Sequence, residues 1–319
     1  MDRRHTPAQT EHFERHGWVL IERLLCDAEI EEALPGLFQL YPTPEQFHAG
    51  ADPRVGRFRG GSDAPENQGD DPRFRPLQFV GLQEFPSSDL ALNLLPLHPA
   101  IIAVAEDLLH TRDVRLYQAE TFAKYTGVTQ YDQPFHADYT NHVMLPPRRD
   151  GRWRQIQLFL YLSDVTAAHG PTRIVSRTLT DDTPVMALSF PRARVPAERH
   201  AAWEAAAESA NGPRGSLLVY SADVVHRGTE MTVEGGGRFF FNLAYRAAGA
   251  DWIGGNPWPR KGISPGWTSL VEALGVRQLE ALGFPPPGHD YWDAETLAEA
   301  AQRYPKLDFA PWRDALRSA

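Results

Sequence analysis

The stretch Ile156-Gln-Leu-Phe-Leu-Tyr-Leu162 decides the fold class, because bulky apolar and aromatic side chains fill all but one of its positions. Three further stretches have strand character and end at turn residues: 114–122, Ser216-Leu-Leu-Val-Tyr220 and Phe239-Phe-Phe-Asn-Leu-Ala-Tyr245. Strands that follow one another without intervening helices indicate antiparallel sheets. We therefore expect a mainly β fold with flanking helices, of the double-stranded β-helix (jelly roll, cupin-like) type.

Helical patterns flank and interrupt these strands. We expect them at 6–40 (two short helices around the strand Trp18–Ile21, the second from Asp27 to Leu34), 99–109, 195–211, 268–282 and 294–303. Residues 42–76 are rich in Pro, Gly, Asp and Arg without periodicity, which predicts a long loop and a candidate lid. The chain 1–319 is expected to form a single domain, in which a helical N-terminal region (1–112) precedes a jelly-roll core (113–247) and an extension (248–319).

The composition excludes several classes of protein. The 319 residues carry 32 Lys and Arg against 41 Asp and Glu, a formal charge of −9, with no basic run for general nucleic-acid binding. The single cysteine, Cys26, allows no internal disulfide. The polar N-terminus does not resemble a signal peptide, and no stretch reaches the roughly 18 apolar residues of a membrane span. We expect a cytoplasmic protein without membrane partners, with a homodimer as the default assembly.

Four residues in order along the chain indicate a metal site. His136-Ala-Asp138 places an imidazole and a carboxylate two residues apart, and such side chains share one face of a strand. His226 and then Arg238 follow at the edges of later strands. Two histidines and one carboxylate form the facial triad of non-haem Fe(II) oxygenases. The planar fork of Arg238 suits a dicarboxylate co-substrate.

Several segments resemble the phytanoyl-CoA dioxygenase family of Fe(II)/2-oxoglutarate-dependent oxygenases, over about residues 10–247. The opening His12-Phe-Glu-Arg-His-Gly-Trp-Val-Leu-Ile21 is similar to the start of that family. Gln118-Ala-Glu-Thr-Phe-Ala-Lys124 resembles the strand that lines the co-substrate pocket. Leu162-Ser-Asp-Val-Thr-Ala-Ala-His-Gly-Pro171 and Gly215-Ser-Leu-Leu-Val-Tyr220, with His226-Arg-Gly-Thr229 after it, resemble two later family segments.

The resemblance implies a role for each of these residues. His136, Asp138 and His226 would hold Fe(II), and Arg238 would pair with the C5 carboxylate of 2-oxoglutarate. Gln118, Phe159 and Tyr161 would line the co-substrate pocket. With O2, the enzyme would hydroxylate, desaturate or cyclise a small organic molecule and release succinate and CO2. Asp138 occupies a coordination position that halogenating relatives leave open for chloride, so halogenation is disfavoured.

Other residues depart from the family pattern or have a simpler explanation. His169, Arg177 and Gly228 stand where the family prefers Asn, a Gly-Ser-His segment and a hydroxyl residue. His142 is expected to be a loop histidine, and Lys124 to be structural or solvated. The arginines 148, 149, 152 and 154 are expected in a solvated loop, and tryptophans 252, 258 and 267 in the packing of the tail.

Two other classes of function stay open at this point. One is a catalytically silent jelly-roll protein that binds a small molecule and retains the metal site as a relic. The other is a metal-dependent isomerase or hydrolase with a different ion on the same ligands, since zinc also accepts His and Asp. Intact ligands beside Arg238 argue against both, because hydrolysis has no use for a dicarboxylate clamp.

Overall fold

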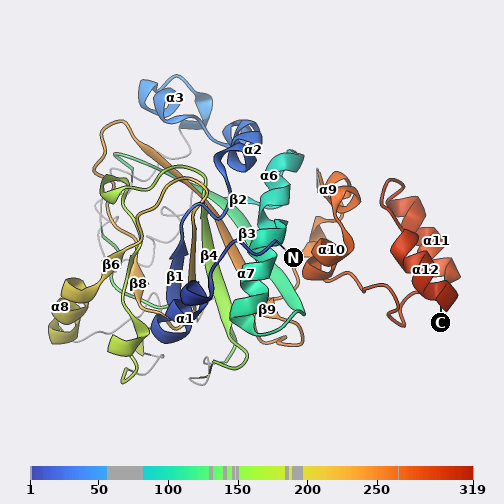
Figure 1. Ribbon diagram of the computed structural model, residues 1–319. Coiled ribbons are helices and arrows are strands. Elements are labelled where there is room, and N and C mark those ends of the chain that lie inside the picture. The colour runs from blue at the N-terminus through green and yellow to red at the C-terminus, as the bar shows by residue number, and fades with distance from the viewer. Residues whose placement is uncertain are drawn as a thin grey trace.

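Antiparallel sheets form the centre of the protein, as Figure 1 shows for the computed structural model. The structure describes residues 2–55, 82–128, 132–138, 142–145, 148, 151–183, 187–188, 197–264 and 266–318. Within these ranges the larger sheet has six strands in the order β1-β7-β4-β9-β3-β2. Their bounds are β1 Trp18–Ile21, β2 Gln83–Glu84, β3 Val114–Tyr125, β4 Gln155–Tyr161, β7 Leu217–Ser221 and β9 Gly237–Ala247. The prediction of antiparallel sheets with flanking helices is confirmed, although the described helices contain more residues than the strands.

A smaller antiparallel sheet provides the second layer. Its described strands lie in the order β6-β5-β8, with bounds β5 Arg173–Ile174, β6 Glu208–Ser209 and β8 His226–Arg227. His136 forms an isolated antiparallel bridge with His226, so the segment before Asp138 lies against β8. These strands are too short to show a period-two pattern, which explains why the sequence did not reveal them.

The two faces of the larger sheet differ in chemistry. Even-numbered residues Ile156–Leu160 of β4 belong to the main apolar core, together with residues of α7 (Pro99–Leu109). Odd-numbered residues Gln155–Tyr161 therefore point to the opposite face, because strand side chains alternate. On the neighbouring strand β9, Arg246 lies opposite Gln155 and Phe240 lies opposite Tyr161. We call this second face the inner face.

The N-terminal helices form where the sequence predicts them. α1 (Pro7–His16) begins after the capping box of Thr6 and ends at Gly17, which has a φ of 79°. α2 (Asp27–Leu40) continues six residues past the predicted end at Leu34 and through Pro35. Burial of Ile30, Ala33 and Leu37 on one side of this helix offsets the hydrogen bond that proline removes.

The prediction of an irregular loop from residue 42 was wrong for the residues of it that the structure describes. Thr43 caps α3 (Pro44–Ala49), and Phe47 is buried and stacks on Tyr125 with ring centroids 3.9 Å apart. A 3-10 turn, Pro53–Val55, follows. The rest of the proposed lid, 56–76, lies outside the described residues. The expectation that no stretch is apolar enough to span a membrane needs correction. The helical stretch Leu90–Leu109, which comprises α6 (Leu90–Leu94), a 3-10 turn and α7, passes by length and composition, but 72% of its apolar 18-residue window is buried inside the protein, as in a core helix.

Two further helical predictions need correction. The insertion 195–211 contains α8 (Ala197–Ala206), but residues 208–209 form β6. The helix expected at 268–282 is two helices, α9 (Trp267–Ala273) and α10 (Val276–Leu282), separated at Leu274 and Gly275. α11 (Ala294–Arg303) follows as predicted, and α12 (Ala310–Ser318) was not predicted. Figure 1 shows α11 and α12 at the outer end of the molecule, beyond α9 and α10.

Candidate metal centre

Backbone pairing brings the two histidines together from distant regions of the chain. The amide of His136 donates to the carbonyl of His226 at 3.0 Å, and the reverse hydrogen bond is 2.9 Å long. Directly opposed residues of an antiparallel pair point their side chains to the same side. The two imidazole centroids lie 4.6 Å apart. Asp138 is two residues from His136, and one ligand atom from each of the three residues lies within 4.8 Å of the others.

The orientation of both rings fits a metal ion. Nδ1 of His136 lies 2.8 Å from the carbonyl oxygen of Pro134, and Nδ1 of His226 lies 3.0 Å from that of Val224. A carbonyl can only accept, so both Nδ1 atoms carry a proton and a neutral ring keeps its lone pair on Nε2. These Nε2 atoms face Asp138, at 3.5 Å for His136 and 3.2 Å for His226. Two such lone pairs beside a carboxylate form the donor set of a bound metal, and in the metal-free protein a proton on Nε2 can take the place of that cation.

The charges of the cluster support the same conclusion. Burial opposes ionisation of Asp138, but the positive charge of His226 and hydrogen bonds from both histidines outweigh it and hold the pKa of Asp138 well below its usual range. Burial lowers the pKa of His226, and the charge of Asp138 reverses this, so the pKa is raised overall. In the absence of a metal, the site therefore favours an anionic carboxylate beside a protonated imidazole.

Tyr220 is a neighbour of the site that the sequence did not reveal. Its hydroxyl donates to Oδ2 of Asp138 at 3.0 Å, and its ring centroid lies 4.6 Å from that of His226. Burial and the charge of Asp138 raise the pKa of Tyr220 well above its usual value, so the phenol stays protonated. A tyrosine inside an apolar strand carries no sequence signal that separates this role from packing.

Arg238 and Lys124 form a pair of buried cations on the inner face. They are register partners on β9 and β3, and their exposed fractions are 6% and 8%. Nη1 of Arg238 donates to the carbonyl of His169 at 3.3 Å, and Nζ of Lys124 donates to that of Thr229 at 2.7 Å. Among the described residues neither cation has a carboxylate within ion-pair distance, and Nε of Arg238 has no hydrogen-bond partner.

Burial weakens both cations in the absence of an anion. It lowers the pKa of Arg238 to about 10. Burial and the charge of Arg238 together lower the pKa of Lys124 to about 7. Lys124 was expected to be structural or solvated; the solvated alternative is wrong, because the side chain is buried. Two adjacent cations without a counter-ion form a site for an anionic ligand such as a dicarboxylate.

The structure brings two of the three predicted pocket residues to this end. Phe159 and Tyr161 stack on Phe240, with centroid distances of 5.4 and 4.8 Å, and the guanidinium of Arg238 lies over the same ring at 4.5 Å. Gln118 lies six residues along β3 from Lys124, a separation of about 20 Å at the usual rise of a strand. The structure thus does not bring Gln118 to Arg238.

Gln118 lies instead beside a hollow of about 380 Å³ that Tyr117 and His142 also line. The hydroxyl of Tyr117 lies 3.3 Å from Nδ1 of His142 and accepts a 3.0 Å hydrogen bond from Gln157. Burial lowers the pKa of His142, and the charge of Asp138 opposes that shift. His142 is thus a half-buried neighbour of the centre, although no ligand atom of the triad lines this hollow.

The positions that depart from the family pattern have structural partners. The amide of Gly228 donates to Gln133 at 2.7 Å, and Arg177 forms an ion pair with Asp223 at 3.2 Å. Trp258 and Trp267 are buried, as expected for packing of the tail, whereas Trp252 is half-buried and lines a hollow. Of the predicted arginine cluster, position 149 lies outside the described residues, and Arg154 forms an ion pair with Glu14 at 3.0 Å.

Comparisons with known proteins agree with this geometry. The phytanoyl-CoA dioxygenase (PhyH) family profile matches residues 13–236. Among solved structures, the non-heme alpha ketoglutarate dependent carbocyclase SnoK from nogalamycin biosynthesis has a TM-score of 0.52 and 16% identity, with 81% of this chain and 90% of that chain covered. EctD from S. alaskensis in its apoform has a TM-score of 0.53 and 15% identity, covering 81% and 84%.

At such identities these structures establish a shared fold. No curated protein matches the chain. The family match covers well over half of the sequence and contains all three residues of the triad. Iron and 2-oxoglutarate are accordingly the cofactor and co-substrate. The chain belongs to the phytanoyl-CoA dioxygenase family of non-haem iron, 2-oxoglutarate-dependent enzymes.

Proposed function

We propose that the protein is an Fe(II)- and 2-oxoglutarate-dependent dioxygenase that hydroxylates, desaturates or cyclises a small organic molecule and releases succinate and CO2. The observation that carries this proposal is a pair of features. Two imidazole Nε2 atoms converge on Asp138, which accepts a hydrogen bond from Tyr220 on the inner face, and the same face of the larger sheet carries the cations Arg238 and Lys124, neither of which has an ion pair among the described residues. The first feature suits a metal ion and the second suits a dicarboxylate.

Each residue has a proposed role in this function. His136, Asp138 and His226 hold the iron, which supplies activation of O2 coupled to decarboxylation of 2-oxoglutarate. Arg238 binds the C5 carboxylate, and Lys124, its register partner, adds a second positive charge. Phe159 and Tyr161 form the apolar wall that keeps water from this carboxylate. Gln118, at the other end of the inner face, is assigned to the substrate mouth.

Asp138 and Tyr220 favour hydrogen removal followed by oxygen insertion over halogenation. The carboxylate of Asp138 occupies the coordination position that a chloride ion would need. The hydroxyl of Tyr220, at 3.0 Å, fixes one carboxylate oxygen and leaves the other free to bind the metal. We therefore expect no chlorinated product when the enzyme turns over in chloride buffer.

We further propose that the larger and smaller sheets form a jelly roll within a single domain, in which the inner face surrounds the centre. The bridge between His136 and His226 supports this arrangement, because it joins the segment carrying Asp138 to a strand of the smaller sheet. The substrate is proposed to be a small molecule that enters between the sheets.

The experiment is an anaerobic titration of the purified protein with Fe(II) and 2-oxoglutarate. We expect a metal-to-ligand charge-transfer band in the wild type and its loss in His136→Ala. His142→Ala is the matched control, because His142 is a half-buried histidine near the site that contacts Tyr117 instead of the triad. A wild type without the band, or a full band in His136→Ala, would contradict the assignment. Formation of succinate with a substrate then separates an enzyme from a silent binding protein.

A further inference from the structure

Unsatisfied polar atoms gather on the inner face beyond the co-substrate end. Among the residues that the structure describes, nine buried side-chain nitrogen or oxygen atoms lack a hydrogen-bond partner, and five of them belong to Gln155, Arg238, Asn242 and Arg246. Residues 238, 242 and 246 lie four apart on β9 and so share one face. Buried polar groups are normally satisfied, so such a row indicates where a ligand binds. Arg238 already has a role, whereas the others do not.

Gln155 and Arg246 form the far end of this row. They are register partners on β4 and β9, so their Cβ atoms are about 5 Å apart. Gln155 is 3% exposed and both its amide atoms lack partners among the described residues. Arg246 is 6% exposed, its Nε also lacks a partner there, and its ion pair, at 3.7 Å, is with Asp251, whose side chain is 88% exposed. The buried charge of Arg246 is therefore only weakly compensated.

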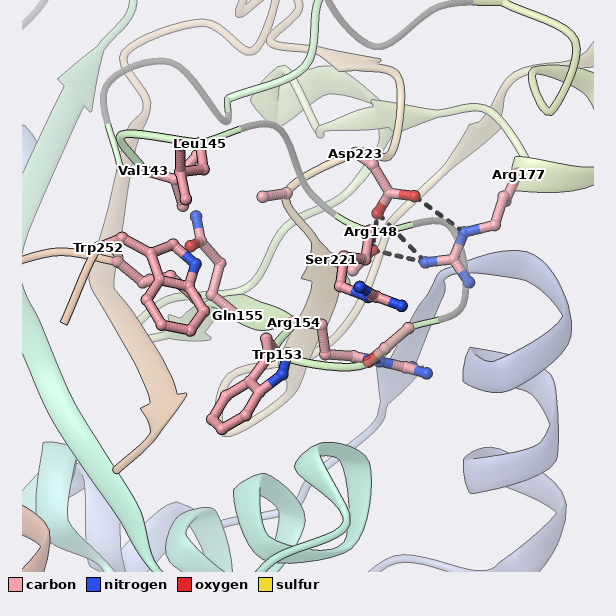
Figure 2. Close-up of a pocket in the computed structure, with 13 residues that line it drawn as sticks. Val143, Leu145, Arg148, Trp153, Arg154, Gln155, Arg177, Ser221, Asp223 and Trp252 are labelled. Atoms are coloured by element: carbon pink, nitrogen blue, oxygen red, sulfur yellow. Dashed lines mark hydrogen bonds and ion pairs between the residues drawn. The ribbon is translucent and has the colours of Figure 1, made fainter. Parts of the chain in front are cut away.

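Gln155 points into a hollow of about 350 Å³. Figure 2 shows its amide in the hollow, with the rings of Trp153 and Trp252 on one side and Arg177 and Asp223 on the other. The two indoles meet edge to face at a centroid distance of 5.4 Å. Their faces and the nearby side chains of Val143 and Ile253 give the hollow an apolar wall suited to a flat ring.

Arg246 does not itself line the hollow but lies next to it, as the register partner of Gln155. The charged groups that do line the hollow already have partners. Arg177 is paired with Asp223, and Arg154 is paired with Glu14. The atoms left to a ligand are therefore the Nε donor of Arg246, the Nε2 donor of Gln155 and the Oε1 acceptor of Gln155. Two adjacent donors match a carboxylate, and the acceptor matches an N–H or O–H group beside that carboxylate.

The hollow lies within reach of the metal centre. Gln157, two residues from Gln155, is the register partner of Tyr220, and Tyr220 donates to Asp138. Gln155 is therefore about 7 Å along β4 from Gln157, the residue that pairs with Tyr220. A ligand anchored at Gln155 and Arg246 extends toward Asp138 if its body is about the size of one ring.

We propose that this hollow is the substrate-recognition site, and that the substrate is a carboxylic acid with a hydroxyl, amine or amide N–H next to the carboxylate and an aromatic or cyclic body. Arg246 and Gln155 bind the carboxylate, Gln155 accepts from the neighbouring donor, and Trp153 and Trp252 contact the ring. The identification of this ligand as a substrate rests on the function proposed above.

The test compares three probe compounds by calorimetric titration under anaerobic conditions. The protein is loaded with Fe(II) and saturated with 2-oxoglutarate, so that Arg238 is occupied. The probes are 3-phenyllactate, 3-phenylpropanoate, which lacks the hydroxyl, and 3-phenyllactamide, which lacks the charge. We expect 3-phenyllactate to bind at least about tenfold more tightly than either of the others, because each lacks one hydrogen bond to a buried polar group.

Variants assign each preference to a residue. Arg246→Met should remove the preference for the carboxylate over the amide, and Gln155→Leu should remove the preference for the hydroxyl. Gln155→Glu keeps the shape of the side chain and should reverse the charge preference, which guards against misfolding in the other two variants. Arg154→Met is the matched control, because this arginine lines the hollow but already pairs with Glu14, so all preferences should remain.

The outcomes separate this proposal from the proposed function. Equal affinity for the three probes in the wild type, or preferences unchanged in Arg246→Met and Gln155→Leu, would overturn the recognition site. The charge-transfer band is read in the same samples. If the band appears but the probes bind equally, the proposed recognition site is wrong and the proposed function stands. If the probes differ but the band is absent, the recognition site stands and the proposed function is wrong.

Discussion

β9 carries a buried arginine near each end of the inner face, and the two differ in how their charge is compensated. Arg238 and Arg246 are eight residues apart, about 27 Å along the strand, and both are 6% exposed. Arg238 has Lys124 as its register partner and no carboxylate within reach among the described residues. Arg246 has Gln155 opposite it and an ion pair with the exposed Asp251.

The difference indicates two kinds of anion site. Two adjacent cations in a buried place attract a dianion strongly, and their mutual repulsion is relieved when that anion binds or when Lys124 loses its proton. One cation beside a neutral amide, with partial compensation from solvent-exposed Asp251, supports weaker binding that depends on hydrogen-bond pattern. The first arrangement suits a co-substrate that never changes. The second suits recognition of one substrate among related acids.

The largest expected effect is on 2-oxoglutarate binding, and it tests directly whether the two arginines differ. Arg238→Met should raise the 2-oxoglutarate concentration for half-saturation by about 100-fold, because loss of a buried charged partner costs several kcal/mol. Iron binding should be nearly unchanged. Arg246→Met is the matched variant, with the same substitution on the same strand, and should change 2-oxoglutarate binding by less than about twofold. The charge-transfer titration measures both. Equal losses in the two variants would make Arg238 a structural residue.

The three residues of the triad could be predicted from sequence because their signal is local and ordered. His136 and Asp138 lie two apart, and His226 and Arg238 follow at the edges of further strands. The long strands β4 and β9 were equally accessible, since runs of apolar and aromatic residues define them. The sequence pattern was thus sufficient to predict the long strands and the four polar residues near the ends of β segments.

The remaining features depend on which partners a side chain meets. Lys124 has no sequence mark of burial, because its state follows from pairing with Arg238 on a strand more than 100 residues away. Gln155 and Tyr220 lie in strands where any side chain on the inner face could be packing. α3 lies in a Pro- and Gly-rich stretch, and Thr43 and Gln46 form its capping box over only six helical residues. Such short elements depend on contacts like that of Phe47 with Tyr125.

A smaller effect, on the affinity for Fe(II), is expected from a substitution of Tyr220. Tyr220→Phe removes the 3.0 Å hydrogen bond to Asp138 and leaves the ring in place. The affinity for Fe(II) should fall by about 30-fold, within the range for loss of a partner of a metal ligand. Tyr41→Phe serves as a control, because its buried hydroxyl bonds to Thr121 on β3. Competition with a colorimetric chelator measures the affinity. An unchanged affinity would mean that Asp138 needs no support.

A smaller effect should appear as a pH dependence that only the Arg238 end shows. The pKa of Lys124 is lowered to about 7, and a bound dianion favours the charged form. Affinity for 2-oxoglutarate should therefore fall by up to about tenfold as the pH rises from 6 to 8.5, since the free protein loses this charge near pH 7. Lys124→Met should bind more weakly at pH 6 and show a flat profile. A wild-type affinity that rises with pH would contradict this assignment.

The same shift has a consequence for stability. Between pH 7 and the normal lysine pKa near 10.4, the unfolded chain holds a proton on this residue that the folded chain has lost. The unfolded state then binds more protons, so the contribution of Lys124 to the free energy of unfolding increases with pH across this window. Urea titrations of the metal-free protein at pH 7.5 and 9.5, compared with Lys124→Met, measure the difference. An equal change in both proteins would assign it to other groups.

The smallest effect on 2-oxoglutarate binding is expected at Gln118. Its position on β3 tests where the co-substrate end of the inner face stops. The resemblance to the family placed this residue in the co-substrate pocket, whereas the strand puts it about 20 Å from Lys124. Gln118→Leu should therefore change half-saturation by 2-oxoglutarate less than about threefold. It donates to Glu120 at 2.9 Å and lines the hollow with Tyr117 and His142. A substrate-dependent rise in succinate formation, weakened in this variant while the charge-transfer band is retained, would place Gln118 on the substrate side. A tenfold loss of 2-oxoglutarate affinity would return it to the co-substrate pocket and require the inner face to be shorter than the strand register indicates.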